Sequence, residues 1–146
     1  MFKHTLTVCV GNICRSPTAE ILLRETLTGP GYLVSSAGIG ALVGKPVEAT
    51  AANVLRAHGH VVHEHQARQL NRAMLHEADL VLAMERPHLE HMLQIAPEAR
   101  GKIFLLGKWQ ADRAVPDPYR QDEAAFEAAY QMIAEGVAAW ASRIHR

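Results

Sequence analysis

Short apolar runs alternate with longer helical patterns along this chain. Four runs have the length and the apolar, β-branched character of buried strands, at residues 5–10, 32–35, 79–84 and 102–106. Helical patterns mark five further segments, at residues 17–27, 47–58, 71–77, 87–95 and 122–144. Strands that are separated by helices form parallel sheets covered on both faces, so the sequence predicts an α/β fold: one three-layer domain with a four-stranded parallel sheet. Such sheets bind ligands beyond the carboxyl ends of their strands.

Length and charge narrow the class of protein further. A chain of 146 residues fits one domain, so we expect residues 1–146 to share one core. The 15 basic side chains are balanced by 15 acidic ones, which removes the broad positive field that nucleic acids or anionic membranes require. No stretch approaches the roughly 20 apolar residues of a membrane span, and the start lacks the features of a signal peptide. We therefore expect a cytoplasmic protein that neither binds nucleic acid nor inserts into a membrane.

The loop after the first expected strand carries the clearest chemical signal. It reads CVGNICRSP, from Cys9 to Pro17, and Pro17 is typical of the first turn of a helix. A loop that curls at a helix N-terminus turns its backbone N–H groups inward, where they form a cradle for phosphate together with the helix dipole. Gly11 relieves the backbone of this turn, and the planar guanidinium of Arg15 can hold two phosphate oxygens.

Cys9 stands at the near end of this cradle, where its sulfur would face a bound phosphorus atom. A helix N-terminus and a neighbouring guanidinium stabilise a thiolate, so we expect Cys9 to be ionised and nucleophilic at neutral pH. Ser16 is placed to donate a hydrogen bond to the sulfur, which would help the thiolate leave a phosphoenzyme. An isolated cysteine in a strand is more often a small packed hydrophobe, but the Arg-Ser-Pro that begins six residues later favours catalysis.

The sequence CVGNICRSPTAE resembles the signature of the low-molecular-weight protein tyrosine phosphatases. Similarity to that family continues through SSAG at residues 35–38, HQARQL at residues 65–70 and DPY at residues 117–119. The resemblance implies a phosphate loop in which the residues around the nucleophile bind phosphate: Val10, Gly11, Asn12, Ile13, Cys14 and Ser16. It also implies two further groups, the supporting residues Ser36 and His65, which contact Asn12, and the substrate-mouth residues Ile39, Leu42 and Tyr119.

A phenolate that leaves phosphorus needs a proton, and Asp117 is the candidate donor. It lies between two prolines at residues 116–119, which stiffen the loop, and burial against Tyr119 would favour the protonated carboxyl. The plain alternative is an Asp-Pro turn, and the family resemblance favours the acid. The expected path is attack by Cys9, protonation of the leaving oxygen by Asp117, and hydrolysis of the phosphocysteine by water that Asp117 deprotonates, with no metal or cofactor.

The histidines give weaker signals. Four of them cluster in the sequence without a cysteine partner or i,i+4 spacing on one helix face, so we interpret them as solvated rather than as a zinc site: His58, His60, His63 and His65. Of these, only His65 is expected to have a structural role. His88 and His91 are interpreted as part of the polar outer face of the helix at residues 87–95.

Several other functions share this fold and loop. Thioredoxin-coupled arsenate reductases use further cysteines outside the loop, and the only cysteines here are Cys9 and Cys14. Cys14 is either a packed thiol or the partner of an oxidised Cys9 in a reversible disulfide. Protein-arginine phosphatases carry threonine where Ile13 stands, and an apolar Ile13 favours an aryl leaving group. A non-catalytic phosphate-binding module would have lost the nucleophile or the acid, yet both Cys9 and Asp117 are present.

Segments outside the loop resemble one bacterial branch of the family, which is linked to capsule and exopolysaccharide export. These segments are GALVGK, ARQL, MERPH and DPYRQ, which begin at residues 40, 67, 84 and 117. The resemblance implies that the partner is a phosphotyrosine protein, the cytoplasmic domain of a membrane tyrosine autokinase with a tyrosine-rich tail.

Overall fold

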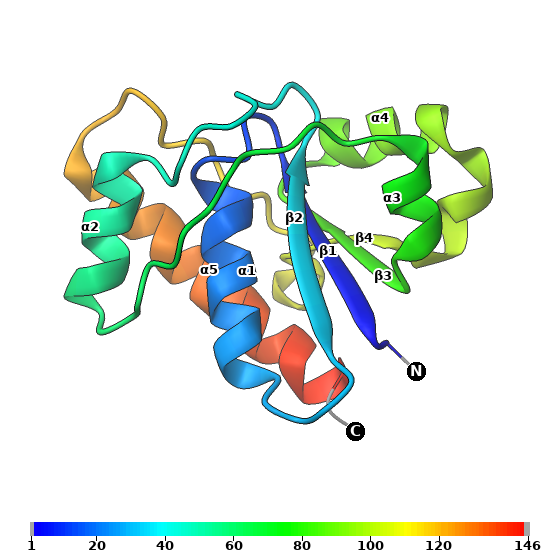
Figure 1. Ribbon diagram of the computed structural model, residues 1–146, viewed down its shortest axis with the longest axis horizontal. Helices are drawn as coiled ribbons and strands as arrows, with labels where there is room; N and C mark the ends of the chain where they lie inside the picture. The colour runs from blue at the N-terminus through cyan, green and yellow to red at the C-terminus, as the bar shows by residue number, and fades with distance from the viewer. Residues whose placement is uncertain (1, 145–146) are drawn as a thin grey trace.

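A four-stranded parallel sheet forms the centre of the computed structural model, which describes residues 2–144 (Figure 1). The strands are β1 (His4–Cys9), β2 (Leu33–Gly38), β3 (Leu80–Ala83) and β4 (Ile103–Leu105), in the order β2-β1-β3-β4. All three strand pairs are parallel. The helices are α1 (Arg15–Thr26), α2 (Ala49–Ala57), α3 (Arg72–Glu77), α4 (Arg86–Ile95) and α5 (Glu123–Ile144), with short 3-10 helices η1 (Pro97–Lys102) and η2 (Lys108–Gln110). The α/β fold expected from the sequence is confirmed.

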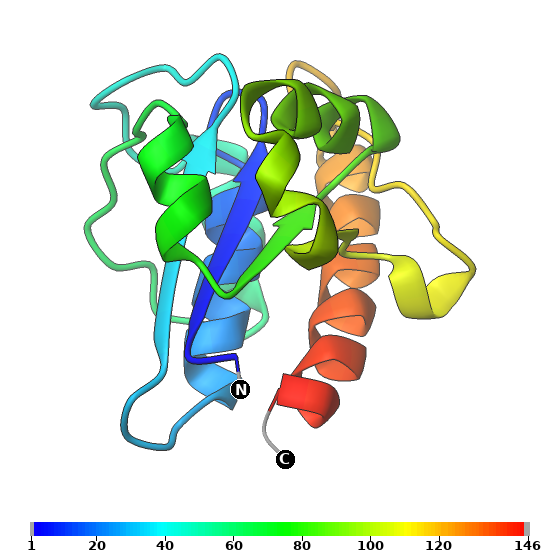
Figure 2. The ribbon, with the colours of Figure 1, turned by 90° about the vertical axis from the view of Figure 1, so that its right-hand side faces the viewer.

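Helices cover both faces of the sheet. α1, α2 and α5 lie on one face, and α3 and α4 lie on the other (Figures 1 and 2). Successive side chains of a strand point to opposite faces, and both faces here are buried. On β3, Leu80 and Leu82 pack into the core beside α1 and α5, whereas Val81 and Ala83 pack into the core beside α3 and α4. This burial on two sides explains why the strands appear in the sequence as continuous apolar runs.

The boundaries of several elements differ from those predicted. β2 continues to Gly38 instead of ending at residue 35, because it pairs with β1 along its whole length, from His4 opposite Leu33 to Cys9 opposite Gly38. α1 begins at Arg15, two residues before Pro17. The two 3-10 helices were not predicted from the sequence.

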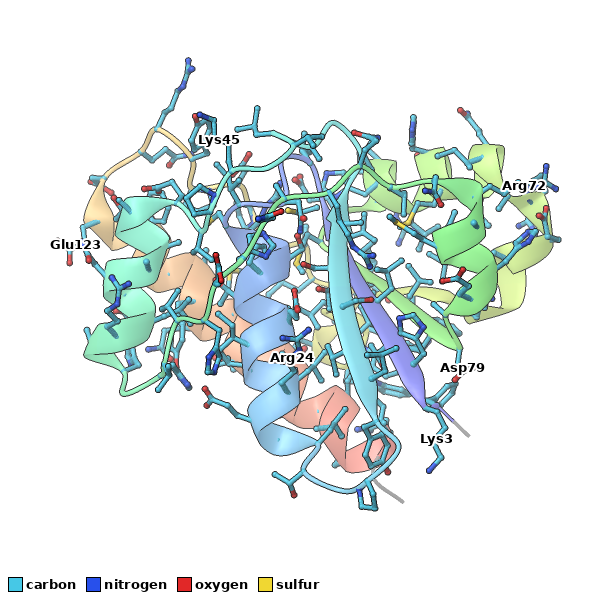
Figure 3. The ribbon with its side chains drawn as sticks, in the orientation of Figure 1. Lys3, Arg24, Lys45, Arg72, Asp79 and Glu123 are labelled. Carbon is cyan, nitrogen blue, oxygen red and sulfur yellow. The ribbon has the colours of Figure 1, made fainter. Side chains whose placement is uncertain are left out.

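Arginine side chains cover the outer edge of β2. Arg24 donates from Nε and Nη2 to the carbonyl oxygen of Val34, over 3.1 and 2.8 Å, and Arg68 donates from Nε to that of Ser36 over 2.8 Å. Arg24 extends from α1 toward this strand (Figure 3). An uncovered edge strand can pair with another chain. These hydrogen bonds occupy backbone oxygens on the free edge of β2 and so protect it from such pairing.

Three loops gather at the carboxyl ends of the strands. They are residues 10–14, 39–48 and 111–122, and both ends of the described chain lie at the opposite end of the molecule (Figure 2). Lys45 marks the loop end, whereas Lys3 and Asp79 mark the other end (Figure 3). Within residues 2–144, no helix is long and apolar enough to cross a lipid bilayer.

Candidate active site

Residues 10–14 connect β1 to α1 and curl over the N-terminus of the helix. The carbonyl oxygens of Cys9, Val10 and Gly11 accept hydrogen bonds from the N–H groups of residues 39, 40 and 42, over 2.9 to 3.0 Å. The N–H groups of residues 11–15 have no hydrogen-bond acceptor within the described chain. No side chain caps the start of α1. The loop therefore offers five consecutive donors at the positive end of a helix, which is the arrangement that binds a phosphate group.

The close approach of β2 to this loop requires a glycine at position 38. A Cβ atom there would lie 2.4 Å from the carbonyl oxygen of Val10 and 3.0 Å from Cβ of Asn12. Any residue other than glycine at position 38 would therefore force the loop backbone to move.

Asn12 holds the loop from inside. Its φ of 59° is in the left-handed region, which asparagine tolerates better than most residues. The buried side chain donates from Nδ2 to Oγ of Ser16 and Oγ of Ser36, each over 2.9 Å, and accepts from the N–H of Arg68 over 2.9 Å. His65 lies 2.7 Å from the backbone oxygen of Asn12, and since a carbonyl only accepts, Nε2 of His65 carries the proton. The contacts of Ser36 and His65 implied by the family resemblance are thus present.

Cys9 is buried at the base of the cradle. Its Sγ lies 2.9 Å from Oγ of Ser16 and 3.4 Å from the N–H of the same residue. The Ser16 hydroxyl already accepts a hydrogen bond from Asn12, so its own proton is free to point at the sulfur. Cys9 therefore has two donors directed at it, which suits a sulfur that carries negative charge.

Arg15 is the most deeply buried charged residue of the site, with 1% of its surface exposed. Its Nη1 donates to Oε2 of Glu85 over 2.6 Å and to the carbonyl oxygen of Val115 over 2.8 Å, so both hydrogens of this nitrogen are used. Neither Nε nor Nη2 makes a hydrogen bond to any described residue. The Nε–Nη2 edge of the guanidinium therefore remains available for the two parallel hydrogen bonds that bind phosphate.

Asp117 approaches the same guanidinium from the loop at residues 111–122. Its Oδ2 lies 3.6 Å from Nη2 of Arg15, and its Oδ1 accepts from the N–H of Tyr119 over 3.0 Å. The carboxyl is 45% exposed, so the predicted burial against Tyr119 is wrong. The physical reason is the Asx turn, which directs one carboxyl oxygen toward the backbone of the turn and leaves the side chain at the surface.

These residues line one cavity of about 160 Å³. Its walls are formed by Cys9, Val10, Gly11, Ile13, Cys14, Arg15, Gly40, Leu42, Asp117 and Tyr119. The predicted mouth residues Leu42 and Tyr119 are present, but Ile39 is not, because its side chain packs against the core on the α3 and α4 face. Val10 and Gly40 take its place at the rim.

The sequence profile described as low molecular weight phosphotyrosine protein phosphatase matches residues 4–146. The chain belongs to this family. A protein-tyrosine phosphatase named Wzb from Salmonella typhimurium is 46% identical over 99% of this chain and 96% of its own length. The structure of Wzb from Vibrio vulnificus in complex with benzylphosphonate is 48% identical, with a TM-score of 0.93 over 98% of this chain and 99% of that one. An arginine phosphatase from Geobacillus stearothermophilus has the same fold at 31% identity, with a TM-score of 0.91 over 99% of this chain and 94% of that one.

This tyrosine phosphatase thus belongs to the bacterial, capsule- and exopolysaccharide-associated branch that its sequence segments indicated. The similarity covers almost the whole chain, so the chain is a phosphatase enzyme. The fold alone does not decide between tyrosine and arginine substrates, because both kinds of enzyme share it. The higher identity to the tyrosine phosphatases favours phosphotyrosine over phosphoarginine as the substrate.

The second cysteine of the phosphatase, Cys14, also lines the cavity. Cys14 is buried, and this burial raises the pKa of its thiol far above its ordinary value, with a further contribution from Cys9. A neutral thiol is a weak nucleophile, so Cys14 is suited to lining the cavity rather than to attacking phosphorus.

Of the four clustered histidines of the phosphatase, His58 and His63 are exposed as predicted, whereas His60 and His65 are partly buried. His58 pairs with Glu127 at 2.8 Å, and His60 lies 2.7 Å from Glu25 and 2.6 Å from the hydroxyl of Tyr130. These contacts join the segment after α2 to α1 and α5. Within residues 2–144, no group of three or more His, Cys, Asp or Glu side chains is arranged to hold a metal ion.

Sequence reasoning missed Glu85 and misplaced His88. The prediction that His88 lies on the polar outer face of its helix is wrong, because it is buried in the first turn of α4. Glu85 directly follows the end of a buried strand region, and an acidic residue at the carboxyl end of a parallel strand is the signal that could have found it. The start of α4 places both residues next to Arg15. The spacing of residues within the α4 segment does not predict this contact, because Arg15 lies far away in the sequence.

Proposed function

We propose that the enzyme hydrolyses phosphotyrosine through a phosphocysteine on Cys9, with Arg15 as the phosphate clamp and Asp117 as the acid and base. The observation that carries this proposal is the shared cavity, which brings together the sulfur of Cys9, the unbonded edge of Arg15 and the carboxyl of Asp117. A nucleophile, an anion clamp and a proton donor in one cavity are the parts that phosphoryl transfer requires.

In the first step the Cys9 thiolate attacks phosphorus in line with the tyrosyl oxygen. The S–P bond forms as the P–O bond to tyrosine breaks, and Asp117 gives its proton to the leaving phenolate. The negative charge on the phosphoryl oxygens is met by the five free loop N–H groups and the Nε–Nη2 edge of Arg15. These groups are held in place before substrate arrives, so they need little reorganisation during the reaction.

In the second step water cleaves the phosphocysteine. The deprotonated Asp117 takes a proton from water as its oxygen bonds to phosphorus, and the S–P bond breaks to return the thiolate of Cys9. The hydroxyl of Ser16, 2.9 Å from this sulfur, supports the charge that returns to it. The products are inorganic phosphate and an enzyme with Asp117 protonated again.

The walls of the cavity favour an aryl leaving group. Ile13 and Leu42 are apolar, and both line the cavity together with Tyr119. A charged guanidinium leaving group would lose hydration against these side chains, whereas an aromatic ring would not. The benzyl group bound by the Vibrio vulnificus relative is of the same chemical kind as a tyrosine ring.

For the partner, we propose the phosphorylated cytoplasmic domain of a membrane tyrosine autokinase of exopolysaccharide export. The similarity to the proteins named Wzb, Etp and EpsP supports this choice. The enzyme would then act in the cytoplasm, where the phosphorylated tail is exposed.

The test compares release of phosphate from a phosphotyrosine peptide and a phosphoarginine peptide, with a chelator present throughout. We expect turnover of phosphotyrosine that Cys9→Ser abolishes and Asp117→Ala lowers by roughly two to four orders of magnitude. Asp122→Asn is the matched control, since it changes an acid outside the cavity. Full activity of Cys9→Ser would refute the catalytic assignment, and faster release from phosphoarginine would assign the enzyme to the other substrate class.

A further inference from the structure

His88 lies buried behind the phosphate clamp with one ring nitrogen unpartnered. Only 7% of its surface is exposed, and its Nδ1 has no hydrogen-bond partner among the described residues. Its Nε2 lies 3.6 Å from Oε2 of Glu85, the same oxygen that accepts from Nη1 of Arg15. Buried polar atoms nearly always make a hydrogen bond. A buried histidine with a nitrogen that makes none therefore indicates a role beyond packing.

Glu85 occupies the N-cap position of α4 but does not cap the helix. The equivalent residues of two other helices do, since Glu48 accepts from the N–H of Thr50 and Asn71 from that of Met74. The carboxylate of Glu85 is turned instead toward Arg15, which it meets at 2.6 Å. The helix thus gives up a stabilising cap in favour of a contact with the guanidinium.

Charged and titratable groups from three elements face His88. They are Arg15 on α1, Glu85 and His91 at the start of α4 and on its second turn, and Asp117 on the loop at residues 111–122. Burial lowers the pKa of His88, and the charge of Arg15 lowers it further, against the opposite effects of Glu85 and Asp117. A neutral ring does not compete as a cation for Glu85, so the guanidinium of Arg15 is the cation that pairs with this carboxylate.

We infer that Glu85 and His88 are positioning residues for phosphoryl transfer. Glu85 holds Nη1 of Arg15, and His88 directs its Nε2–H toward the Glu85 carboxylate and limits the positions which that carboxylate can take. With Nη1 fixed from behind, the Nε–Nη2 edge of Arg15 stays turned toward the phosphate. This inference rests on the proposed role of Arg15 as the phosphate clamp.

Glu85→Gln tests the first link, because it keeps the shape of the side chain and removes its charge. At pH 7 we expect the inhibition constant of inorganic phosphate to rise and kcat/KM for a phosphotyrosine peptide to fall. Each should change by about tenfold or more, the size of effect seen when residues that orient metal ligands are replaced. The resonances of the Arg15 guanidinium N–H groups should broaden or merge, because rotation about the Cζ–Nη1 bond is freed. Glu90→Gln, an exposed change on the same helix, should leave all three readouts as in the wild type.

His88→Gln and His88→Leu test the second link. Glutamine can place an N–H donor where Nε2 of histidine lies, whereas leucine only fills the space. We expect His88→Gln to keep phosphate binding within about threefold of wild type and His88→Leu to weaken it about tenfold, with His91→Gln as the control. Equal phosphate binding by the glutamine and leucine variants would show a packing role and overturn the part of the inference that concerns His88.

Failure of this inference can be told apart from failure of the proposed function. If Cys9→Ser is inactive while Glu85→Gln binds phosphate and shows Arg15 resonances like the wild type, only the positioning role is overturned. The Glu85 side chain is 33% exposed, so Glu85→Gln should fold even where a change at buried His88 does not. The Glu85 variant therefore decides the part of the inference that concerns Glu85, whatever the His88 variants do.

Discussion

Asn12 donates a hydrogen bond from Nδ2 to Oγ of Ser16 over 2.9 Å, and this bond fixes which way the Ser16 hydroxyl faces. A hydroxyl has one proton to give, and one of the two lone pairs of the Ser16 oxygen accepts the hydrogen bond from Asn12. The proton is therefore directed at the sulfur of Cys9, 2.9 Å away. Asn12 itself is held by Ser36, which donates in turn to Oε1 of Glu20 over 2.5 Å. A chain of hydrogen-bonded side chains thus ends on the nucleophile.

Ser16→Ala should slow the second chemical step more than the first. The lost hydrogen bond to a charged sulfur is worth about 1.5–3 kcal/mol, which corresponds to a rate reduced by roughly 10- to 100-fold when the thiolate leaves. Rapid-quench kinetics with an aryl phosphate should then show a burst of phenol followed by slow release of phosphate. Ser142→Ala, on the exposed face of α5, serves as the control. A steady state without a burst, at an unchanged rate, would contradict this role of Ser16.

Gly38→Ala should lower activity through the backbone of the phosphate loop. The added Cβ would meet the carbonyl oxygen of Val10 at 2.4 Å, and neither backbone can move without shifting the loop. Overpacking of this kind costs about 1–3 kcal/mol, and we expect kcat/KM to fall at least tenfold. Gly101→Ala is the matched control, since nothing lies within 4 Å of its Cβ position. Urea unfolding and phosphatase assays measure both effects, and equal behaviour of the two variants would refute the steric argument.

The sequence was sufficient for the parts of this structure that depend on local patterns. Strands β1 to β4 are buried on both faces and so leave continuous apolar runs, while the loop from Cys9 to Arg15 is contiguous and its chemistry is visible in order. What could not be predicted depends on packing between distant segments. The pairing of Arg15 with Glu85 joins residues 70 positions apart, and the carbonyl of Val115 comes from 100 positions away. The prediction placed His88 on the surface because it relied on the polarity of the side chain. The burial of His88 depends instead on how α4 packs near Arg15, which the local sequence does not show.

Alkylation should distinguish the two cysteines. Burial and the neighbouring Cys9 raise the pKa of Cys14, so this thiol remains protonated and slow to react at neutral pH. We expect iodoacetamide at pH 7 to label Cys9 first, and inorganic phosphate to protect Cys9 by filling the cradle. Mass spectrometry of proteolytic peptides locates the label when Cys9→Ser and Cys14→Ser are compared with the wild type. Faster labelling of Cys14 would show that the loop opens more readily than the structure suggests.

The stability of the protein should depend on pH through His88. Burial and Arg15 lower the pKa of this histidine below its ordinary value of 6.5. As the pH falls below about 6.5, the unfolded chain therefore binds a proton at this position before the folded chain does, and the free energy of unfolding decreases. Above that pH neither state is protonated there, so the contribution is fully present and constant.

His88→Gln isolates this effect, because glutamine does not titrate. Urea unfolding of wild type and His88→Gln between pH 5 and pH 8 should give a difference in unfolding free energy that is constant above about pH 7. Below about pH 6.5 this difference should move in favour of the variant and level off once the folded histidine is protonated as well. His63→Gln, which changes an exposed histidine on another segment, should follow the wild type. A difference between wild type and His88→Gln that stays constant throughout this range would mean that His88 titrates alike in the folded and unfolded chain, and would contradict the prediction.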